Sequence, residues 1–310
     1  MSCLVNLPNY QHQTYTEGSV LNGTVVCWIP HQIKVTGVMV KLKGKERNKW
    51  KESYGEHTCT YSDTVKFIRN ELILQPKRKL GPGTFEYPFT FQLPSGSLLN
   101  SYHGPYGGIR YTVDAKVDIP FAPDYTDKKE ITVFHPVDLN KENYQGYWAP
   151  AKYSVSKLVS SWCCCVSGSV TMDVYLEKRC FVPGEQLRVQ VHVTNQSDTD
   201  VDEVSAKIKR RVTSRILSLF ENKHRDDVEE IAISVSRGVK ARYANTYDLK
   251  LPIPEDTKVL NFHGSRLFEQ ETMLSVTALF YWQSNLKVKT ELVMGHIPVG
   301  GPHHNQPPDL

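Results

Sequence analysis

The sequence predicts an all-β protein built from two tandem immunoglobulin-like antiparallel β-sandwich domains. Apolar and polar residues alternate with a period of two through most of its 310 residues, as in strands with one buried face. We find no long amphipathic helix. The strand pattern also repeats itself after about 160 residues, which indicates two copies of one β-unit. A chain of this length is normally divided into two domains.

The clearest alternation lies in residues 109–119, 187–193 and 274–282. Antiparallel sheets packed in pairs have this pattern, with one face in the core and one in water. In residues 33–42 the apolar row shifts by one position at Thr36-Gly37, which predicts a β-bulge.

Residues 80–94 read LGPGTFEYPFTFQLP and hold the most pronounced apolar row of the chain. A strand places Phe85, Tyr87, Phe89 and Phe91 on one face, and we expect this face in the core of the first domain. Pro88 has no N–H to donate to a neighbouring strand, so it predicts an edge strand or a bulge.

One segment, residues 214–230, has helical spacing at Ile216, Leu217 and Phe220. It predicts either a short helix or a strand end followed by a charged loop.

The repeat sets the domain boundaries. Residues 15–28 align with residues 181–194, and FTFQLP (89–94) aligns with YDLKLP (247–252). The alternation lapses between the copies. We therefore expect a first domain over 1–140, a linker over 141–166, a second domain over 167–300 and a short Pro-rich tail over 301–310.

The composition excludes several classes of protein. The formal net charge is +4, a mild excess that argues against a dedicated nucleic-acid binder. The first residues lack the pattern of a secretory signal, and no apolar run is long enough to span a bilayer. Seven cysteines, three of them adjacent, do not resemble a disulfide framework. We expect reduced thiols and a cytoplasmic protein.

We find no motif for catalysis, a cofactor or a metal. The sequence has no GxSxG nucleophile elbow, no phosphate-binding P-loop and no HExxH zinc helix, and its histidines are scattered. We therefore expect no catalytic residue, no cofactor and no metal site.

Basic residues gather in three runs. The first run has a basic residue at every second position of an expected strand. If the strand continues past Gly44, these cations share one face. The run consists of Lys41, Lys43, Lys45, Arg47, Lys49 and Lys51. The second is Lys77, Arg78 and Lys79, and the third is Lys207, Lys209, Arg210, Arg211 and Arg215. One interpretation is a solvated outer sheet face whose charges prevent edge pairing. The other is a binding surface for anionic lipid headgroups, phosphorylated tails or acidic juxtamembrane segments.

Two groups of cysteines are candidate sites. Cys163, Cys164 and Cys165 follow Trp162 and could be palmitoylated, or they could be buried and inert. Cys59 lies in a polar segment that we expect to be a loop, where its thiol would be accessible to a protein partner.

The two halves resemble the two domains of arrestins. The N-terminal half carries IKVTGVMVKLKGKERNKW, PGTFEYPFTFQLP and GGIRYTVDAKVDIPF in the order of an arrestin N-domain. The C-terminal half carries SGSVTMDVYLEKRCFVPGEQLRVQVHVTNQS and closes with LKVKTELVMGHIPVGG, like an arrestin C-domain. The segment CCCVSGSVTM is similar to the arrestin-domain-containing, or α-arrestin, branch.

This resemblance implies the arrestin fold and a function. Members of the branch are non-catalytic cytoplasmic adaptors that link transmembrane cargo to endosomal sorting and ubiquitin-dependent trafficking, with recruitment to the plasma membrane or endosomes. They bring in HECT-type ubiquitin ligases through PPxY motifs. Here residues 307–310 read PPDL, with leucine in place of the tyrosine, so the chain has no PPxY. Two alternatives are open: a thioredoxin-binding redox regulator with Cys59 as the partner thiol, and a coat-type scaffold like the arrestin-fold subunit of retromer.

Overall fold

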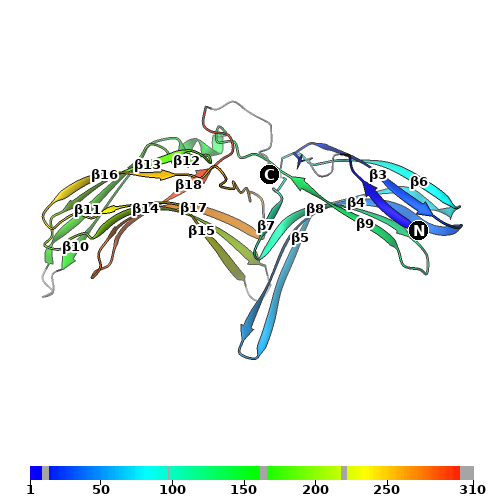
Figure 1. Cartoon of the computed structure of the whole chain (residues 1–310), viewed down its shortest axis with the longest axis horizontal. Helices are drawn as coiled ribbons and strands as arrows, with labels where there is room; N and C mark the ends of the chain where they lie inside the picture. The colour runs from blue at the N-terminus through cyan, green and yellow to red at the C-terminus, as the bar shows by residue number, and fades with distance from the viewer. Residues whose placement is uncertain (9–13, 97, 161–165, 218–221, 301–310) are drawn as a thin grey trace.

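The protein folds as two β-sandwich domains that meet end to end in an arch (Figure 1). The computed structural model describes residues 1–8, 14–96, 98–160, 166–217 and 222–300. Within these ranges the regular secondary structure is strand except for one short 3₁₀ helix, so the predicted all-β class is confirmed.

The first domain contains nine strands. They are β1 (Ser2–Asn6), β2 (Thr14–Tyr15), β3 (Val20–Ile29), β4 (Ile33–Tyr54), β5 (His57–Leu80), β6 (Gly83–Gln92), β7 (Tyr102–Gly104), β8 (Gly107–Asp118) and β9 (Tyr125–Val133). One sheet has the order β1-β3-β6, and the other has the order β2-β9-β8-β4-β5, with β7 added beside β8. All pairs except β2–β9 are antiparallel.

The second domain begins after the 3₁₀ helix η1 (Glu142–Tyr147). Its strands are β10 (Ala151–Ser160), β11 (Val166–Leu176), β12 (Cys180–Phe181), β13 (Gln186–Asn195), β14 (Glu203–Ile216), β15 (Lys223–Arg237), β16 (Ala244–Pro252), β17 (Phe268–Leu279) and β18 (Leu286–Met294). They form sheets with the orders β10-β11-β13-β16 and β12-β18-β17-β14-β15. Residues 151–160, within the expected linker, therefore belong to the second sandwich as β10.

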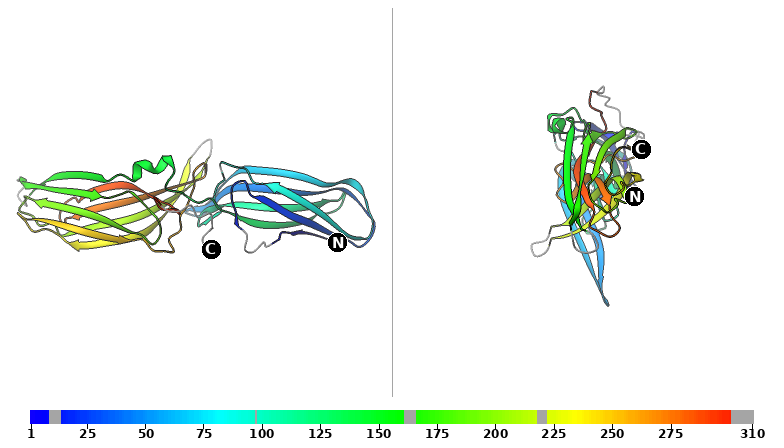
Figure 2. Two further views of the ribbon diagram at one scale, coloured as in Figure 1. Left: turned by 90° about the horizontal axis from the view of Figure 1, so that it is seen from above. Right: turned by 90° about the vertical axis from the view of Figure 1, so that its left-hand side faces the viewer.

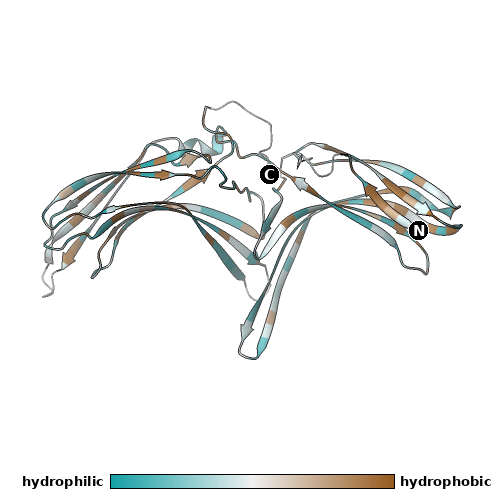
Figure 3. Ribbon diagram, in the orientation of Figure 1, coloured by the Kyte–Doolittle hydropathy of each residue, from teal (hydrophilic) through white to brown (hydrophobic). Residues whose placement is uncertain are grey.

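Each sandwich buries the apolar rows that the alternation predicts. In β13 the apolar residues Leu187, Val189, Val191 and Val193 are buried, and the residues between them face water. Figure 3 shows the same banding of apolar and polar residues along the strands of both domains. The result is one core per domain.

The aromatic row of residues 80–94 lies on β6 and packs into the first core. Phe89 and Phe91 are buried, and Phe85 and Tyr87 are half-buried against the same cluster. Among the strands that the structure describes, β6 pairs with β3 alone, so Pro88 occupies an edge strand, as its missing N–H predicts.

The structure has a register shift between β4 and β5 near the predicted bulge, but not at Thr36-Gly37 itself. It lies between Val38 and Met39, which pair with Gln75 and Ile73, so the extra residue is Leu74 of β5.

The described residues of 214–230 contain no helix, so the short helix is wrong for them; residues 218–221, with Phe220, lie outside the described residues. Residues up to Ile216 belong to β14, and those from Lys223 belong to β15, which pairs with β14 along its whole length. The charged residues that suggested a loop, 223–230, belong to β15, which is the mostly exposed edge strand of its sheet. Cross-strand pairing therefore overrides the local helical spacing.

The two domains share a joint at the centre of the arch. Tyr102 of β7 stacks edge-on against Phe262 and Phe268 from the second domain, with ring centroids 4.9 and 5.3 Å apart. Together with Leu267, these phenylalanines extend the core of the first domain. Beside the joint, the paired ends of β4 and β5 project from the arch as a long hairpin (Figures 1 and 2).

Candidate partner-binding surface

Strand β4 has two chemically different faces. Burial alternates from Val40 to Asn48 without a break at Gly44, so the first basic run shares one outer face of the sheet. The inner face carries Leu42 in the core and then changes to polar residues, with Glu46 and Asn48 buried at the domain joint.

The outer face of this sheet carries a group of cations from four strands, which we call the Lys45 cluster. It consists of Lys45, Arg47, Lys66, Arg110 and Lys128. Lys45 lies opposite Lys66 of β5 and opposite Arg110 of β8. Partial burial, with the nearby charges of Lys128 and Arg47, lowers the pKa of Lys45. Mutual repulsion of this kind favours an anion on this face.

The remaining residues of the first two runs differ in their surroundings. Lys41 and Lys43 form ion pairs with Glu71 at 3.1 Å and Asp114 at 2.6 Å, so their charges are balanced. Lys49 and Lys51 lie further along β4 on the projecting hairpin. The second run, residues 77–79, lies at the far end of β5 from the hairpin tip and is not brought together with the Lys45 cluster.

The third run is divided between two faces of β14. Arg210 points inward, is 7% exposed, and binds the Lys258 carbonyl and the Glu229 carboxylate. Arg211 lies near Asp226 and Glu271, at 3.8 and 3.7 Å.

Arg215 pairs with Glu269. Lys207 and Lys209 remain on the outer face of β14.

The sequence analysis missed the partners of these two lysines. Lys207 and Lys289 both lie opposite Ser275 of β17, on its two sides, and Lys287 is the next outward residue of β18. We call Lys207, Lys209, Lys287 and Lys289 the Lys289 cluster. Burial and then the charges of the other three lysines lower the pKa of Lys287. The alternation LKVKTELVM was the available signal, since its outward positions begin with two lysines.

Both clusters lie on the same side of the molecule. The sheets containing β4 and β14 form the underside of the arch in Figure 1, and their outer faces bear the two clusters. The β4–β5 hairpin projects from the middle of this concave side. In the part of the chain that the structure describes, Lys207, Lys287 and Lys289 form no ion pair, and neither do Lys45 and Arg47.

The projecting hairpin is held by the β14–β15 hairpin of the second domain. Arg225 donates to the Glu52 carboxylate at 2.7 Å, and the Leu217 N–H donates to Asp63 at 2.8 Å. Cys59 lies opposite Glu52 on this hairpin and is exposed. The segment around Cys59 is thus a strand rather than the expected loop, because β4 and β5 stay paired up to the Tyr54–His57 turn.

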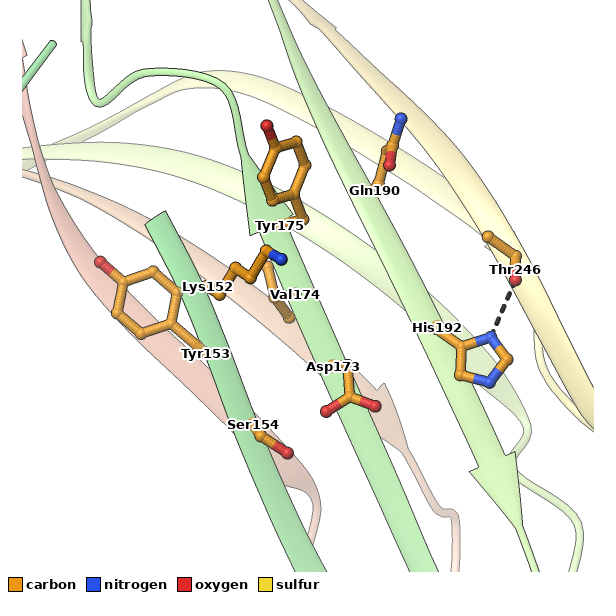
Figure 4. A pocket seen from close by; sticks show the side chains of 9 residues that line it. All are labelled: Lys152, Tyr153, Ser154, Asp173, Val174, Tyr175, Gln190, His192 and Thr246. Atoms are coloured by element: carbon orange, nitrogen blue, oxygen red, sulfur yellow. Dashed lines mark hydrogen bonds between the residues drawn. The ribbon is translucent and has the colours of Figure 1, made fainter. Parts of the chain in front are cut away.

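A hollow of about 450 Å³ lies on the opposite, upper sheet of the second domain (Figure 4). Lys152, Tyr175 and His192 line it, and His192 Nδ1 lies 2.8 Å from the Thr246 hydroxyl. Asp173 brings a carboxylate into the same hollow. The hollow thus contains both a cation, Lys152, and an anion, Asp173, whereas the two clusters contain cations alone.

Three other kinds of site were considered: a metal site, a membrane-spanning helix and a palmitoylation site. Within the described ranges, no group of His, Cys, Asp and Glu residues is arranged to hold a metal ion. In the same part of the chain, no helix is long and apolar enough to cross a bilayer. The candidate palmitoylation residues Cys163, Cys164 and Cys165 lie outside the described residues.

The tandem sandwiches, their shared joint and the projecting hairpin define an arrestin-type protein. Models of the arrestin (or S-antigen) N-terminal domain and C-terminal domain match residues 3–140 and 166–299. The chain therefore belongs to the arrestin family.

Its relatives include proteins of the α-arrestin branch. The chain is 29% identical to mouse arrestin domain-containing protein 4 over 59% of its own length and 46% of the relative's. It is 30% identical to arrestin domain-containing protein 17 of Caenorhabditis elegans, over 61% and 47%. Mouse thioredoxin-interacting protein is 27% identical over 60% and 48%. The matches cover about half the length of these relatives.

Proposed function

We propose that this protein is a non-catalytic cytoplasmic adaptor that binds acidic segments of transmembrane cargo on its concave face. The observation that supports this proposal is the position of the Lys45 and Lys289 clusters, one on each domain and both on the same side. An extended acidic segment passing under the arch would contact both clusters. The resemblance to α-arrestins supports extending the same proposal to a link from such cargo to endosomal sorting and HECT-type ubiquitin ligases.

The shape of the concave face favours a polypeptide over a membrane. A bilayer is flat on the scale of the molecule, and the projecting hairpin would meet it before either cluster did (Figure 1). A peptide can follow the curved sheets on both sides of the hairpin.

Binding between opposite charges in solvent is weakened by salt, because the Debye length shortens to about 3 Å at 1 M.

The test is the binding of a fluorescent Asp- and Glu-rich peptide, measured by anisotropy at low and high salt. We expect Lys45→Glu and Lys289→Glu each to weaken binding at least several-fold, and the double variant to weaken it further. Lys77→Glu is the matched control, because Lys77 is an exposed cation outside both clusters.

Two results would contradict the proposal. Equal losses in Lys77→Glu and in the cluster variants would mean that only net charge matters. Binding to phosphatidylserine vesicles without binding to the peptide would favour the membrane instead.

A second function has one observation in its favour. Cys59 is exposed on the projecting hairpin, where a protein thiol partner such as thioredoxin could reach it. A mixed disulfide with thioredoxin that forms in the wild type and disappears in Cys59→Ser would support this function. A coat-type scaffold would instead require a stoichiometric partner complex on co-purification.

A further inference from the structure

A pair of cysteines faces the core of the first domain. Cys3 of β1 and Cys27 of β3 are directly opposite each other in the antiparallel register. Both are free thiols, with exposed fractions of 5% and 0%. Among the described strands, β1 pairs with β3 alone and forms the edge of its sheet.

The hydrogen bonding of Val5 defines the type of this pair. The Val5 N–H donates to the Asp127 carboxylate at 2.8 Å and therefore points away from β3. Hydrogen-bonded and non-hydrogen-bonded pairs alternate along an antiparallel ladder. Val5 and Val25 are thus a non-hydrogen-bonded pair, and so are Cys3 and Cys27, two positions away.

Such a pair has the spacing that a disulfide needs. In a non-hydrogen-bonded pair the Cα atoms are about 4.5 Å apart. Disulfides join residues whose Cα atoms are about 4.4 to 6.8 Å apart, and both side chains here point to the same face. No backbone movement is required for a bond between the two sulfur atoms.

We propose that Cys3 and Cys27 form a reversible cross-strand disulfide when the protein meets a small disulfide oxidant such as glutathione disulfide. Separation of the short edge strand β1 from β3 gives the oxidant access to both thiols.

The exchange takes place in two steps. In one of the two orders of attack, the Cys27 thiolate attacks one sulfur of glutathione disulfide and releases one glutathione thiolate. The Cys3 thiolate then attacks the Cys27 sulfur and releases the second glutathione. The two protein thiol protons pass to the two glutathione thiolates, so two thiols are oxidised and one disulfide is reduced.

The two thiols differ in acidity while β1 and β3 are paired. The hydrogen bond from Cys3 lowers the pKa of Cys27, and the same bond raises the pKa of Cys3. Separation of β1 from β3 breaks this hydrogen bond, so either thiolate can attack first in the open state, and the second attack closes the same disulfide.

Two other described cysteines lack such a partner. Cys180 lies opposite Val293, and Cys59 lies opposite Glu52. The opposed pair is therefore specific to β1 and β3 among the described cysteines.

The bond would join the edge strand covalently to the rest of its sheet. Leu4 lies in a hydrogen-bonded pair with Val26, so its amide reports whether β1 separates from β3.

The test is to incubate the full chain with glutathione disulfide, block free thiols with N-ethylmaleimide and digest without reduction. Trypsin leaves both cysteines on one peptide, whereas cleavage after Glu17 separates them. We expect two peptides linked through Cys3 and Cys27. Their joint mass is lower by two hydrogens than the sum of the two reduced peptides, and dithiothreitol separates them. The Leu4 amide is expected to exchange at least several-fold more slowly in the linked protein.

Matched variants make the result specific. Cys180→Ala removes a buried cysteine without an opposite thiol and is expected to keep the link. Cys3→Ala, at the edge strand, and Cys27→Ala are expected to lose it. The proposal is overturned if Cys59 becomes fully glutathionylated while Cys3 and Cys27 are both recovered as N-ethylmaleimide adducts. Unchanged Leu4 exchange in linked protein would overturn the claim that the bond holds β1.

Discussion

His296 is a half-buried histidine that connects the end of the first domain to the end of β18. Its ring Nδ1 accepts the Val137 N–H at 2.9 Å, and the backbone N–H of His296 donates to the Val137 carbonyl at 2.8 Å. Phe134 packs edge-on against its ring. Burial, and to a lesser degree the charge of His135, lowers the pKa of His296 to about 4.

This pKa predicts a loss of stability in mild acid. Between the unfolded pKa of about 6.5 and the folded value, the unfolded chain binds more protons, so the free energy of unfolding falls as pH falls. A protonated Nδ1 also cannot accept the Val137 N–H. We expect His296 to make the protein about 2 kcal/mol less stable at about pH 5 than at about pH 7.5. Urea unfolding at both pH values measures this difference.

The control is His296→Asn, whose side-chain oxygen can accept the same N–H without titrating. We expect its stability to change much less between the two pH values. An equal change in the variant and the wild type would assign the pH dependence to other groups.

At the scale of elements, β6 shows how an edge strand contributes to a core. Phe89 packs beside Phe91, with ring centroids 5.7 Å apart, and lies against Gly23 of β3. A Cβ atom at Gly23 would come within 2.5 Å of the Phe89 ring, so the glycine provides the space for this ring.

Truncation of this ring should therefore be costly. We expect Phe89→Ala to lower the free energy of unfolding of the first domain by about 3 to 5 kcal/mol, through lost burial and the cavity left behind. Phe85→Ala, at a half-buried position of the same row, should cost less. Chemical denaturation measures both, and wild-type stability in Phe89→Ala would place the core elsewhere.

Period-two alternation predicted most strands, because each strand of a sandwich has one wet face. It did not predict the pairing of β14 with β15, since three apolar residues at helical spacing also fit a strand end and a turn. It found Lys207 but not Lys289, because these lysines meet across β17 and are far apart in the sequence. One signal was overlooked: the inward positions of β4 change from Leu42 to Gly44, Glu46 and Asn48, and a polar inward row indicates a buried contact beyond the core.

At the scale of the whole molecule, the joint depends on polar groups of β4 that bind the main chain of the second domain. The Glu46 carboxylate is 1% exposed and accepts hydrogen bonds from the Ser265 hydroxyl and the N–H groups of Arg266 and Leu267. The Asn48 amide donates to the Leu267 carbonyl at 3.1 Å. These contacts hold the 261–267 segment, which contains Phe262, against the first domain where Phe262 meets Tyr102.

Loss of the Glu46 charge should loosen this joint. Hydrogen bonds to a charged group contribute about 1.5 to 3 kcal/mol. We expect Glu46→Gln to lower the opening free energy at the Leu267 amide by about 2 kcal/mol. Amide hydrogen exchange measures this opening. Glu71→Gln, which removes an exposed carboxylate paired with Lys41, is the control and should leave the Leu267 amide unchanged.

Strand β4, 22 residues long, has a mechanical consequence. It is one uninterrupted strand. Its N-terminal part lies in the first core, its middle lies at the joint, and its C-terminal part belongs to the projecting hairpin. Lys45 and Arg47, which we propose to contact a partner, alternate along it with Glu46 and Asn48, which form hydrogen bonds to the second domain. A displacement of the strand by binding on its outer face would therefore act directly on the neighbouring residues at the joint. No loop separates the two sets of residues.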